Sequence, residues 1–193
     1  EMADNAGRMA AISDLPVIAD ADTGFGSEIS AYRTVREYER RGVAAIHIED
    51  QQFPKRCGHL DGKAIVPRDE FIMKIQAAAA AKRSPDFMVI ARTDARAVAG
   101  LDEAIWRANA AFDAGADMAF VEAPQSQEEA GAIPGMVRGP CLLNFHRGGK
   151  TPNLDLRWAE EVGYKLAIVP GLLLRSVVAI CDMMLAELKA THR

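Results

Sequence analysis

Charged residues in this sequence follow short apolar runs at regular points along the chain. The stretch PVIADADTGFG contains Asp20 and Asp22, and AAIHIED carries Glu49 directly after its apolar residues. Arg92 follows the run FMVIA, and Glu122 follows MAFV. Random solvation would not place acids and bases so regularly, because solvated charges usually lie on exposed helix faces. We therefore interpret these residues as parts of one chemical site.

The three carboxylates have the chemistry of a divalent metal site. Asp20 and Asp22 alternate along one predicted strand, which would put both side chains on the same side of it. Together with Glu49 they would repel one another unless a cation neutralised them. Mg²⁺ accepts a few carboxylates and keeps several waters, and Mn²⁺ would also fit. The alternative is that Asp20 or Asp22 caps the turn DTGFG. In that turn Gly24 would let the backbone approach a carboxylate.

Arg92, Glu122 and Asn144 extend the pattern toward substrate binding. The guanidinium of Arg92 can hold a carboxylate through two parallel hydrogen bonds, or it can pair with Asp94 or Glu122. Glu122 can take a proton, orient a catalytic group, or simply pair with Arg92. Asn144, in the run CLLNF, can donate to a substrate oxygen or cap the strand end. Local sequence leaves these alternatives open.

A loop without strand or helix periodicity interrupts the regular pattern. Its residues 51–64, QQFPKRCGHLDGKA, place Cys57 between a proline and two glycines. A thiol on a mobile loop can give or take a proton, and the adjacent Lys55 and Arg56 would favour its thiolate form. The alternative is an ordinary exposed thiol beside a turn. The carboxylates that follow the apolar runs favour the catalytic interpretation.

The elements that must carry these residues alternate between strands and helices. In RRGVAAIHIED, DAGADMAFVEA and EVGYKLAIVPG a helical pattern ends at a glycine and a short apolar run follows. Six strands are predicted, at 16–21, 44–49, 87–92, 118–123, 141–145 and 166–170. Helices are predicted at about 28–41, from Pro67 onward, over LDEAIWRANAAFDAG and DLRWAEEVG, and at about 172–189, with at most a short one at 128–137.

Continuous apolar strands that alternate with helices indicate a parallel α/β fold. We predict one domain over residues 1–193, a (β/α)₈ TIM-type barrel, with a doubly wound sheet as the alternative. A complete barrel takes about 250 residues, so its first two strands are expected to be absent before residue 1. In a parallel barrel all strand C-termini open on one face, and the polar residues described above would converge there.

Bulk composition argues against several kinds of partner. The formal charge of −4 does not indicate nucleic acid or an anionic membrane, and no apolar run is long enough to span a bilayer. The three cysteines are widely spaced without a C-x-x-C pair, which argues against structural zinc and favours a reducing, cytoplasmic environment. GFG at 24–26 lacks the third glycine of a dinucleotide-binding loop. DADTG departs from the aspartyl-phosphatase pattern at Gly24.

Five motifs in fixed order carry a family resemblance: ADADTGFG, HIEDQQFPKRCGH, VIARTDA, FVEAP and GGKTP. Through them the chain resembles the isocitrate lyase/phosphoenolpyruvate mutase superfamily from about residue 15 to about residue 175. PKRCGH is the most specific element. It is similar to the carbon–carbon lyase branch, which includes isocitrate lyase, methylisocitrate lyase and dimethylmalate lyase.

The resemblance implies a Mg²⁺-dependent lyase that cleaves a small 2-hydroxy di- or tricarboxylate, such as methylisocitrate or dimethylmalate, by retro-aldol chemistry. It implies that Asp20, Asp22 and Glu49 hold the metal. It also implies that Cys57 is the general acid/base, on a loop that closes over the substrate. Matching motif positions imply further roles, namely substrate contacts at Gly58, His59, Arg92 and Asn144, and catalytic roles for Arg92 and Glu122.

The resemblance leaves the exact reaction open. Oxaloacetate decarboxylase or phosphonopyruvate/carboxyphosphonoenolpyruvate mutase-type chemistry is one alternative, and a barrel that binds a carboxylate without catalysis is another. The thiol of Cys57 favours the lyase. NFHRGGKTP, with His146 and Arg147, departs from methylisocitrate lyases, and LDGK is more similar to the dimethylmalate-lyase side. The superfamily also implies a homotetramer that exchanges a C-terminal helix, which we expect to lie beyond this chain.

Overall fold

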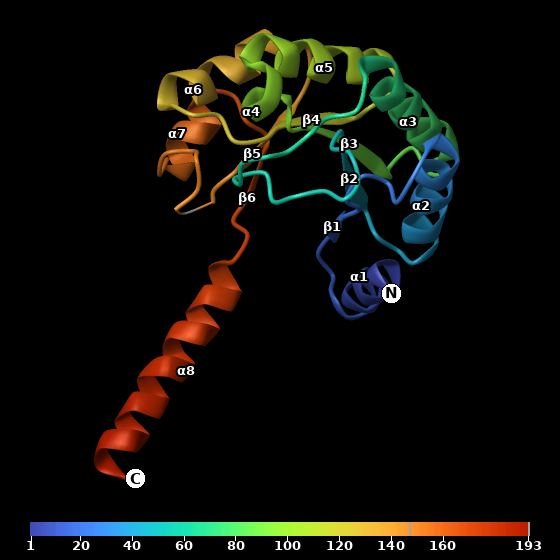
Figure 1. Cartoon of the computed structure of the whole chain (residues 1–193). Coiled ribbons are helices and arrows are strands. Elements are labelled where there is room, and N and C mark those ends of the chain that lie inside the picture. Colours follow the sequence, from blue (N-terminus) through green and yellow to red (C-terminus); the bar gives the residue numbers. More distant parts are fainter. Residues whose placement is uncertain (147, 193) are drawn as a thin grey trace.

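The computed structural model describes residues 1–146 and 148–192, and it is built on one parallel sheet. The strands lie in sequential order, and each hydrogen-bonds to the next strand along the chain. Helices cover the outer, convex side of this curled sheet (Figure 1). The strands are β1 (Ile18–Asp20), β2 (Ala45–Glu49), β3 (Met88–Thr93), β4 (Met118–Val121), β5 (Cys141–Asn144) and β6 (Leu166–Ile168).

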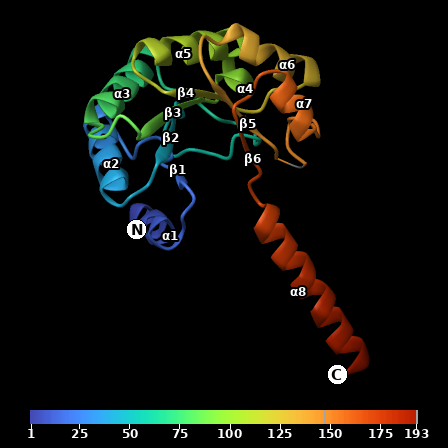
Figure 2. The same ribbon diagram turned by 180° about the vertical axis from the view of Figure 1, so that it is seen from behind.

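The helices form an arc around the sheet, with two exceptions at the ends of the chain. α1 lies beside β1 at one end of the arc, and α8 projects away from the body (Figure 2). The helices are α1 (Met2–Ile12), α2 (Glu28–Arg40), α3 (Arg68–Ala81), α4 (Ala95–Ala99), α5 (Leu101–Asp113), α6 (Gln127–Met136), α7 (Leu156–Glu161) and α8 (Leu172–Thr191).

The strand order distinguishes between the two predicted architectures. A doubly wound sheet reverses its strand order at a switch point, whereas a β/α barrel adds each strand beside the previous one. The strands follow the second pattern without a reversal, and the sheet curls as a barrel wall does (Figure 1). The barrel-type fold is therefore confirmed, as an open part of a barrel in which, among the described residues, β1 and β6 do not pair.

Side-chain alternation along the strands separates two packing surfaces. Ile46 and Ile48 of β2 belong to a buried cluster that includes Val35 of α2 and Phe71 of α3, so they face the outer helices. Phe120 of β4 belongs to a different cluster, made of strand residues. Because successive strand residues point to opposite faces, this second cluster lies on the inner face of the sheet. Residues that alternate with the outward set therefore point toward the barrel interior.

Two helices differ from the sequence prediction. α6 has ten residues, although its segment contains two glycines and Pro134. It is stabilised at its start because the side chain of Ser126 accepts a hydrogen bond from the backbone N–H of Glu129 at 3.1 Å. The five-residue α4, which directly follows β3, was not predicted, because a single helical turn carries no periodicity.

α8 is a helix of 20 residues, none of which is buried. Its apolar side chains are accessible along its length, with Leu173 79% and Leu174 69% exposed. Charged residues interrupt its apolar sequence at several positions. None of the helices described for this chain is long and apolar enough to cross a membrane.

Candidate active site

The strand register brings Glu49 and Arg92 together. They are direct neighbours where β2 pairs with β3, and alternation points both toward the inner face. The Nε of Arg92 lies 3.3 Å from Oε2 of Glu49 and donates to Oδ2 of Asp94 at 3.0 Å. The side chain of Arg92 is 9% exposed, and both carboxylates are completely buried. The predicted ion pair with Asp94 is thus formed, whereas the substrate-binding role of Arg92 stays a prediction.

Buried carboxylates keep Arg92 charged. Burial by itself would lower the pKa of Arg92, but Asp94, Glu122 and Glu49 raise it above its ordinary value. The guanidinium is therefore a permanent cation at the carboxyl end of β3. Such a group can bind a substrate carboxylate through a pair of parallel hydrogen bonds.

Glu49 is a buried carboxylate with unsatisfied oxygens. Burial raises the pKa of Glu49 to about 7, although Arg92 opposes the shift. Neither oxygen of Glu49 accepts a hydrogen bond from a described residue. Buried polar atoms of this kind are rare and call for an explanation such as an ion. Lys55 Nζ lies 2.6 Å from Oδ1 of Asp22 and 3.7 Å from Oε2 of Glu49, so a cation already bridges the two acids.

Asp20 and Asp22 do not share one side of a strand, so the prediction from alternation is wrong. β1 ends at Asp20, and Asp22 has a φ of 47°, which places it in a turn. The backbone N–H of Asp22 donates to Oδ1 of Asp20 at 2.8 Å, which is the turn-capping role. Within residues 1–146 and 148–192, no group of three or more Asp, Glu, His or Cys side chains is arranged to hold a metal ion. A place for Asp20 beside Asp22 and Glu49 in a metal site stays a prediction.

Residues 51–64 form a loop, called the lid loop below, that lies against the carboxyl ends of β3 and β4. A Cβ at Gly58 would overlap the side chain of Glu122 and lie 2.7 Å from Nη2 of Arg92. Glycine therefore allows the backbone to approach these two groups closely. Cys57 precedes this contact and is exposed. The structure thus brings together four predicted site residues, Gly58, His59, Arg92 and Glu122, and Cys57 is next to them in the chain.

Glu122 follows β4 and is held by the side chains around it. His59 Nε2 lies 2.9 Å from Oε1 of Glu122, and the backbone N–H of Lys150 donates to Nδ1 of His59 at 3.0 Å. Because Nδ1 accepts that hydrogen bond, Nε2 carries a ring proton, and it lies close to Glu122 without forming a well-aligned hydrogen bond among the described residues. Asn144 Nδ2 lies 3.3 Å from each oxygen of Glu122. Burial would raise the pKa of Glu122, but His59, Arg92 and Asn144 lower it below its ordinary value, so this carboxylate is ionised.

The two basic residues beside Cys57 make their contacts elsewhere. Lys55 bridges the acids described above, and the guanidinium of Arg56 donates to the backbone carbonyl of Asp61 at 3.3 Å. The expected effect of these cations on the Cys57 thiolate stays a prediction that no direct contact supports. Cys141 is buried, and burial raises the pKa of its thiol to about 12, which disfavours the thiolate form.

A buried network behind the site was not predicted. Asp50 accepts hydrogen bonds from the hydroxyl of Thr93 at 2.6 Å, the backbone N–H of Asp94 at 2.8 Å and Nη1 of Arg107 at 3.2 Å. Arg107 also donates to the carbonyl of Val66, just beyond the lid loop, at 2.9 Å. Asp50 does follow an apolar run closely, so the sequence pattern that marked the other site residues also applied to it. Its pairing with Arg107 spans 57 positions, and no local pattern predicts it.

Gly24, which was noted in the sequence, and His47 have packing contacts. Gly24 has a φ of +80°, a Cβ there would lie 3.2 Å from Cβ of Ala31, and its carbonyl accepts from the Thr34 hydroxyl at 3.2 Å. The turn therefore needs glycine to pack against α2, and substrate contact at Gly24 stays a prediction. His47 is buried on the inner face, and its ring makes a T-shaped contact with Phe120 at a centroid distance of 5.8 Å.

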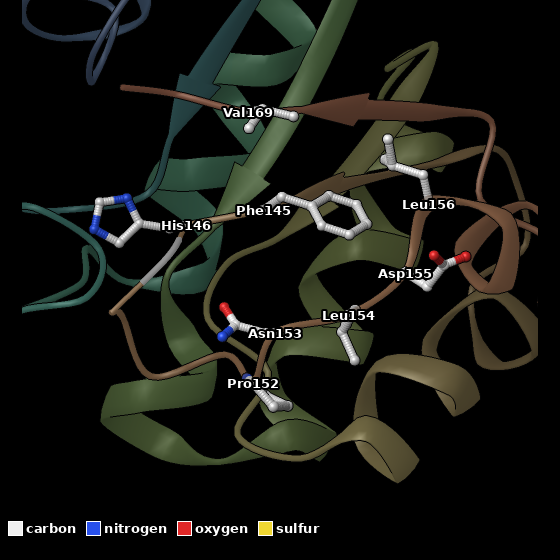
Figure 3. A pocket seen from close by; sticks show the side chains of 8 residues that line it. All are labelled: Phe145, His146, Pro152, Asn153, Leu154, Asp155, Leu156 and Val169. Carbon is white, nitrogen blue, oxygen red and sulfur yellow. The ribbon is translucent and has the colours of Figure 1, made fainter. Parts of the chain in front are cut away.

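A cavity of about 420 Å³ lies beside the site, at the carboxyl ends of β5 and β6 (Figure 3). Phe145 and His146, adjacent in sequence, point to opposite sides of the chain in this view. The ring of His146 stacks on His59 with centroids 4.4 Å apart, so it connects the cavity with the lid loop. Arg147, noted in the sequence beside it, lies outside the described residues. The cavity is lined by Phe145, His146, Pro152, Asn153, Leu154, Asp155, Leu156 and Val169.

Residues 1–189 match the family model described as phosphoenolpyruvate phosphomutase. The chain is 47% identical over 170 residues to the 2,3-dimethylmalate lyase of Eubacterium barkeri, an alignment that covers 88% of this chain and 59% of that protein. It is 47% identical over 193 residues to the probable 2-methylisocitrate lyase 1 of Corynebacterium glutamicum, covering 98% and 62%. The chain therefore spans about three fifths of the length of these relatives.

Comparison with solved structures relates the chain to enzymes of the same kind. The fold superposes on a crystal structure of 2,3-dimethylmalate lyase with a TM-score of 0.94 at 42% identity, covering 100% of this chain and 65% of that one. It superposes on phosphonopyruvate hydrolase in complex with oxalate and Mg²⁺ with a TM-score of 0.82 at 29% identity, covering 98% and 67%. The arrangement of strands and outer helices is thus shared along the whole described chain.

Proposed function

The chain belongs to the phosphoenolpyruvate phosphomutase family, and on that premise we propose that it is a Mg²⁺-dependent carbon–carbon lyase that acts on a small 2-hydroxy di- or tricarboxylate. The observation that carries this proposal is the position of the lid loop. It places Gly58 directly on Arg92 and Glu122, with Cys57 next in the chain. The backbone next to the thiol therefore lies against a buried cation and a buried carboxylate at the carboxyl end of the sheet, beside the acid pair.

Asp22 and Glu49, with Asp20 as the predicted third carboxylate, are the residues that would hold the Mg²⁺. The Glu49 oxygens have no hydrogen-bond partner among the described residues, and the Lys55 ammonium shows that the pair attracts a cation. Two carboxylates with water ligands suit Mg²⁺, which rarely occupies a site made only of protein groups. When bound, the ion would offset the negative charge of the keto acid that forms. The Mg²⁺ in the phosphonopyruvate hydrolase structure supports this choice of metal.

The remaining groups of this chain supply binding and proton transfer. Arg92 binds a substrate carboxylate, and the lid loop excludes water above it. The substrate hydroxyl gives up its proton, and Glu122, whose lowered pKa favours its carboxylate form, is the group proposed to accept it. The carbon–carbon bond breaks with its electron pair on the carbon beside the second carboxylate. The thiol of Cys57 then protonates that carbon, and the products are an oxo acid and a shorter acid.

A substrate panel tests the proposed function. Purified protein with Mg²⁺ is expected to release pyruvate from 2,3-dimethylmalate or 2-methylisocitrate, or glyoxylate from isocitrate. EDTA should stop this release and added Mg²⁺ should restore it. Turnover of oxaloacetate or phosphonopyruvate alone would favour another reaction of the family. Calorimetry that detects Mg²⁺-dependent binding of these acids without turnover would favour a non-catalytic barrel.

We also propose that the protein assembles as a homo-oligomer through α8. From the sequence, the helix that subunits exchange was expected to lie beyond this chain. α8 nevertheless has the properties of a helix that packs on another subunit, because it projects from the body (Figure 1) and its apolar residues are exposed. Exposed apolar surfaces of this extent mark interaction sites. Light scattering is expected to give a multiple of the 20.9 kDa chain mass. Leu173→Glu with Leu185→Glu should shift the mass to one subunit, and a monomeric unsubstituted protein would contradict the proposal.

A further inference from the structure

Two buried side chains of the lid loop hold the backbone on either side of Cys57. The first is Gln51, which is 1% exposed. Its Nε2 donates to the carbonyl of Arg56 at 2.8 Å, and its Oε1 accepts from the N–H of Arg56 at 3.0 Å. The residue that precedes the thiol is therefore fixed through both of its backbone polar groups.

The second side chain is Lys63, at the other end of the loop. Its ammonium donates a hydrogen bond to the carbonyl of Gly58, the residue that follows the thiol. It also lies 3.2 Å from Oδ1 of Asp94, and the two side chains are 1% and 0% exposed. A buried ammonium has a high desolvation cost unless it is paired and hydrogen-bonded. Both conditions are met here, by a carboxylate at the end of β3 and by the carbonyl beside Cys57.

The base of the loop gives these two side chains fixed origins. The N–H of Gln52 donates to the carbonyl of Ala64 at 2.8 Å, and the N–H of Val66 donates to the carbonyl of Asp50 at 2.9 Å. The two ends of the loop are therefore paired across its base. Gln51 and Lys63 extend from this closed base, so they connect the tip that carries Cys57 to the rigid sheet.

The carboxylate of Asp94 is shared between the lid loop and the substrate-binding arginine. Asp94 contacts the ammonium of Lys63 through Oδ1 and accepts from Nε of Arg92 through Oδ2 at 3.0 Å. A shift of Lys63 would therefore change both the position of Gly58 and the partner of Arg92. One buried anion therefore contacts both the arginine proposed to bind the substrate and the lysine that holds the backbone beside the thiol.

We propose that Gln51 and Lys63 are positioning residues that set the location of Cys57 over the carboxyl ends of β3 and β4. This inference rests on the proposed lyase function for its kinetic consequences. The two residues do not touch the substrate; they act through the backbone of Arg56 and Gly58. A thiol displaced by about 1 Å from the carbanion can lose about 100-fold in rate.

The test compares Lys63→Met with Lys82→Met. Lys82 is a matched control because its ammonium contacts both oxygens of Asp117, at 2.9 and 2.8 Å, at the amino end of β4. Lys63→Met is expected to lower kcat by about 10- to 100-fold, with a smaller rise in KM because Lys63 shares Asp94 with the substrate-binding Arg92. Hydrogen exchange of the amides in residues 51–64 should quicken by about tenfold or more, as their anchoring is lost. Lys82→Met should leave kcat and exchange in this loop unchanged.

Gln51→Met keeps the test decisive if Lys63→Met does not fold. It removes both hydrogen bonds to Arg56 and is expected to give the same fall in kcat and the same faster exchange. Unchanged kcat and unchanged loop exchange in a folded variant would overturn the inference, as would an equal loss of kcat in Lys82→Met. If the unsubstituted protein turns over no acid of the panel, the proposed function fails. In that case hydrogen exchange of the lid-loop amides alone tests whether Gln51 and Lys63 hold the backbone around Cys57.

Discussion

Replacement of Cys57 by serine is expected to lower the turnover number of the lyase reaction by about 100- to 10,000-fold. The serine hydroxyl occupies nearly the same space as the thiol but is a much weaker acid. It would therefore fail to protonate the carbanion that remains when the carbon–carbon bond breaks. Pyruvate or glyoxylate release, followed with the substrate that the panel identifies, measures the effect.

Stability measurements separate this chemical effect from a structural one. Cys57 is exposed, and substitutions of exposed residues usually change the free energy of unfolding by less than about 0.5 kcal/mol. Thermal unfolding of Cys57→Ser should therefore match that of the unsubstituted protein. Cys181→Ser, at another exposed cysteine, serves as the matched control and should retain full turnover. Binding of Mg²⁺ should also persist, because Asp22 and Glu49 are untouched.

Full turnover in Cys57→Ser would contradict the assigned role of the thiol. If oxaloacetate is turned over equally well by Cys57→Ala, decarboxylation becomes the better assignment. The reason is that the carboxyl group leaves as carbon dioxide and the lid-loop thiol is not needed to break the bond. The same substitution thus distinguishes two reactions that share the acid pair and Arg92.

The sequence predicts the inner-face groups of the site well, because alternation in parallel strands is a local property. Glu49, Arg92 and Asn144 each alternate with outward-facing apolar residues, so their orientation follows from a period of two. Their proximity then follows from sequential strand order, which pairs Glu49 with Arg92 directly. Asp22 is different: it lies in a turn beyond β1, where a positive φ replaces the extended conformation. Alternation carries no information there.

The contacts that the lid loop makes cannot be predicted from local sequence patterns. His59 meets Glu122, and Lys63 meets Asp94, across separations that depend on how far the loop folds back over the sheet. A loop of this length has no repeating pattern that fixes its path. The basic residues illustrate the limit, because Lys55 contacts Asp22 rather than staying beside the thiol. Only the folded chain shows which charges meet.

Replacement of Arg92 by methionine is expected to lower the free energy of unfolding by about 3 to 5 kcal/mol. Methionine keeps much of the side-chain volume but removes the charge. Glu49 and Asp94, both completely buried, would lose the cation that lies 3.3 and 3.0 Å from them. Urea unfolding measures the loss. Arg138→Met is the matched control, because the exposed pair of Arg138 with Asp113 should contribute only about 0 to 1 kcal/mol.

The cost of losing Arg92 should also depend on pH in metal-free protein. Burial raises the pKa of Glu49 from 4.5 to about 7, so folding favours its protonated form and ionisation opposes folding as pH rises between these values. Arg92 partly offsets this effect by attracting the charged form. Arg92→Met should therefore be less destabilising at pH 5 than at pH 8, when measured in EDTA. An equal loss at both values would contradict the assignment of Glu49 as the charge that Arg92 compensates, and a loss no larger than that of Arg138→Met would contradict the buried ion pair itself.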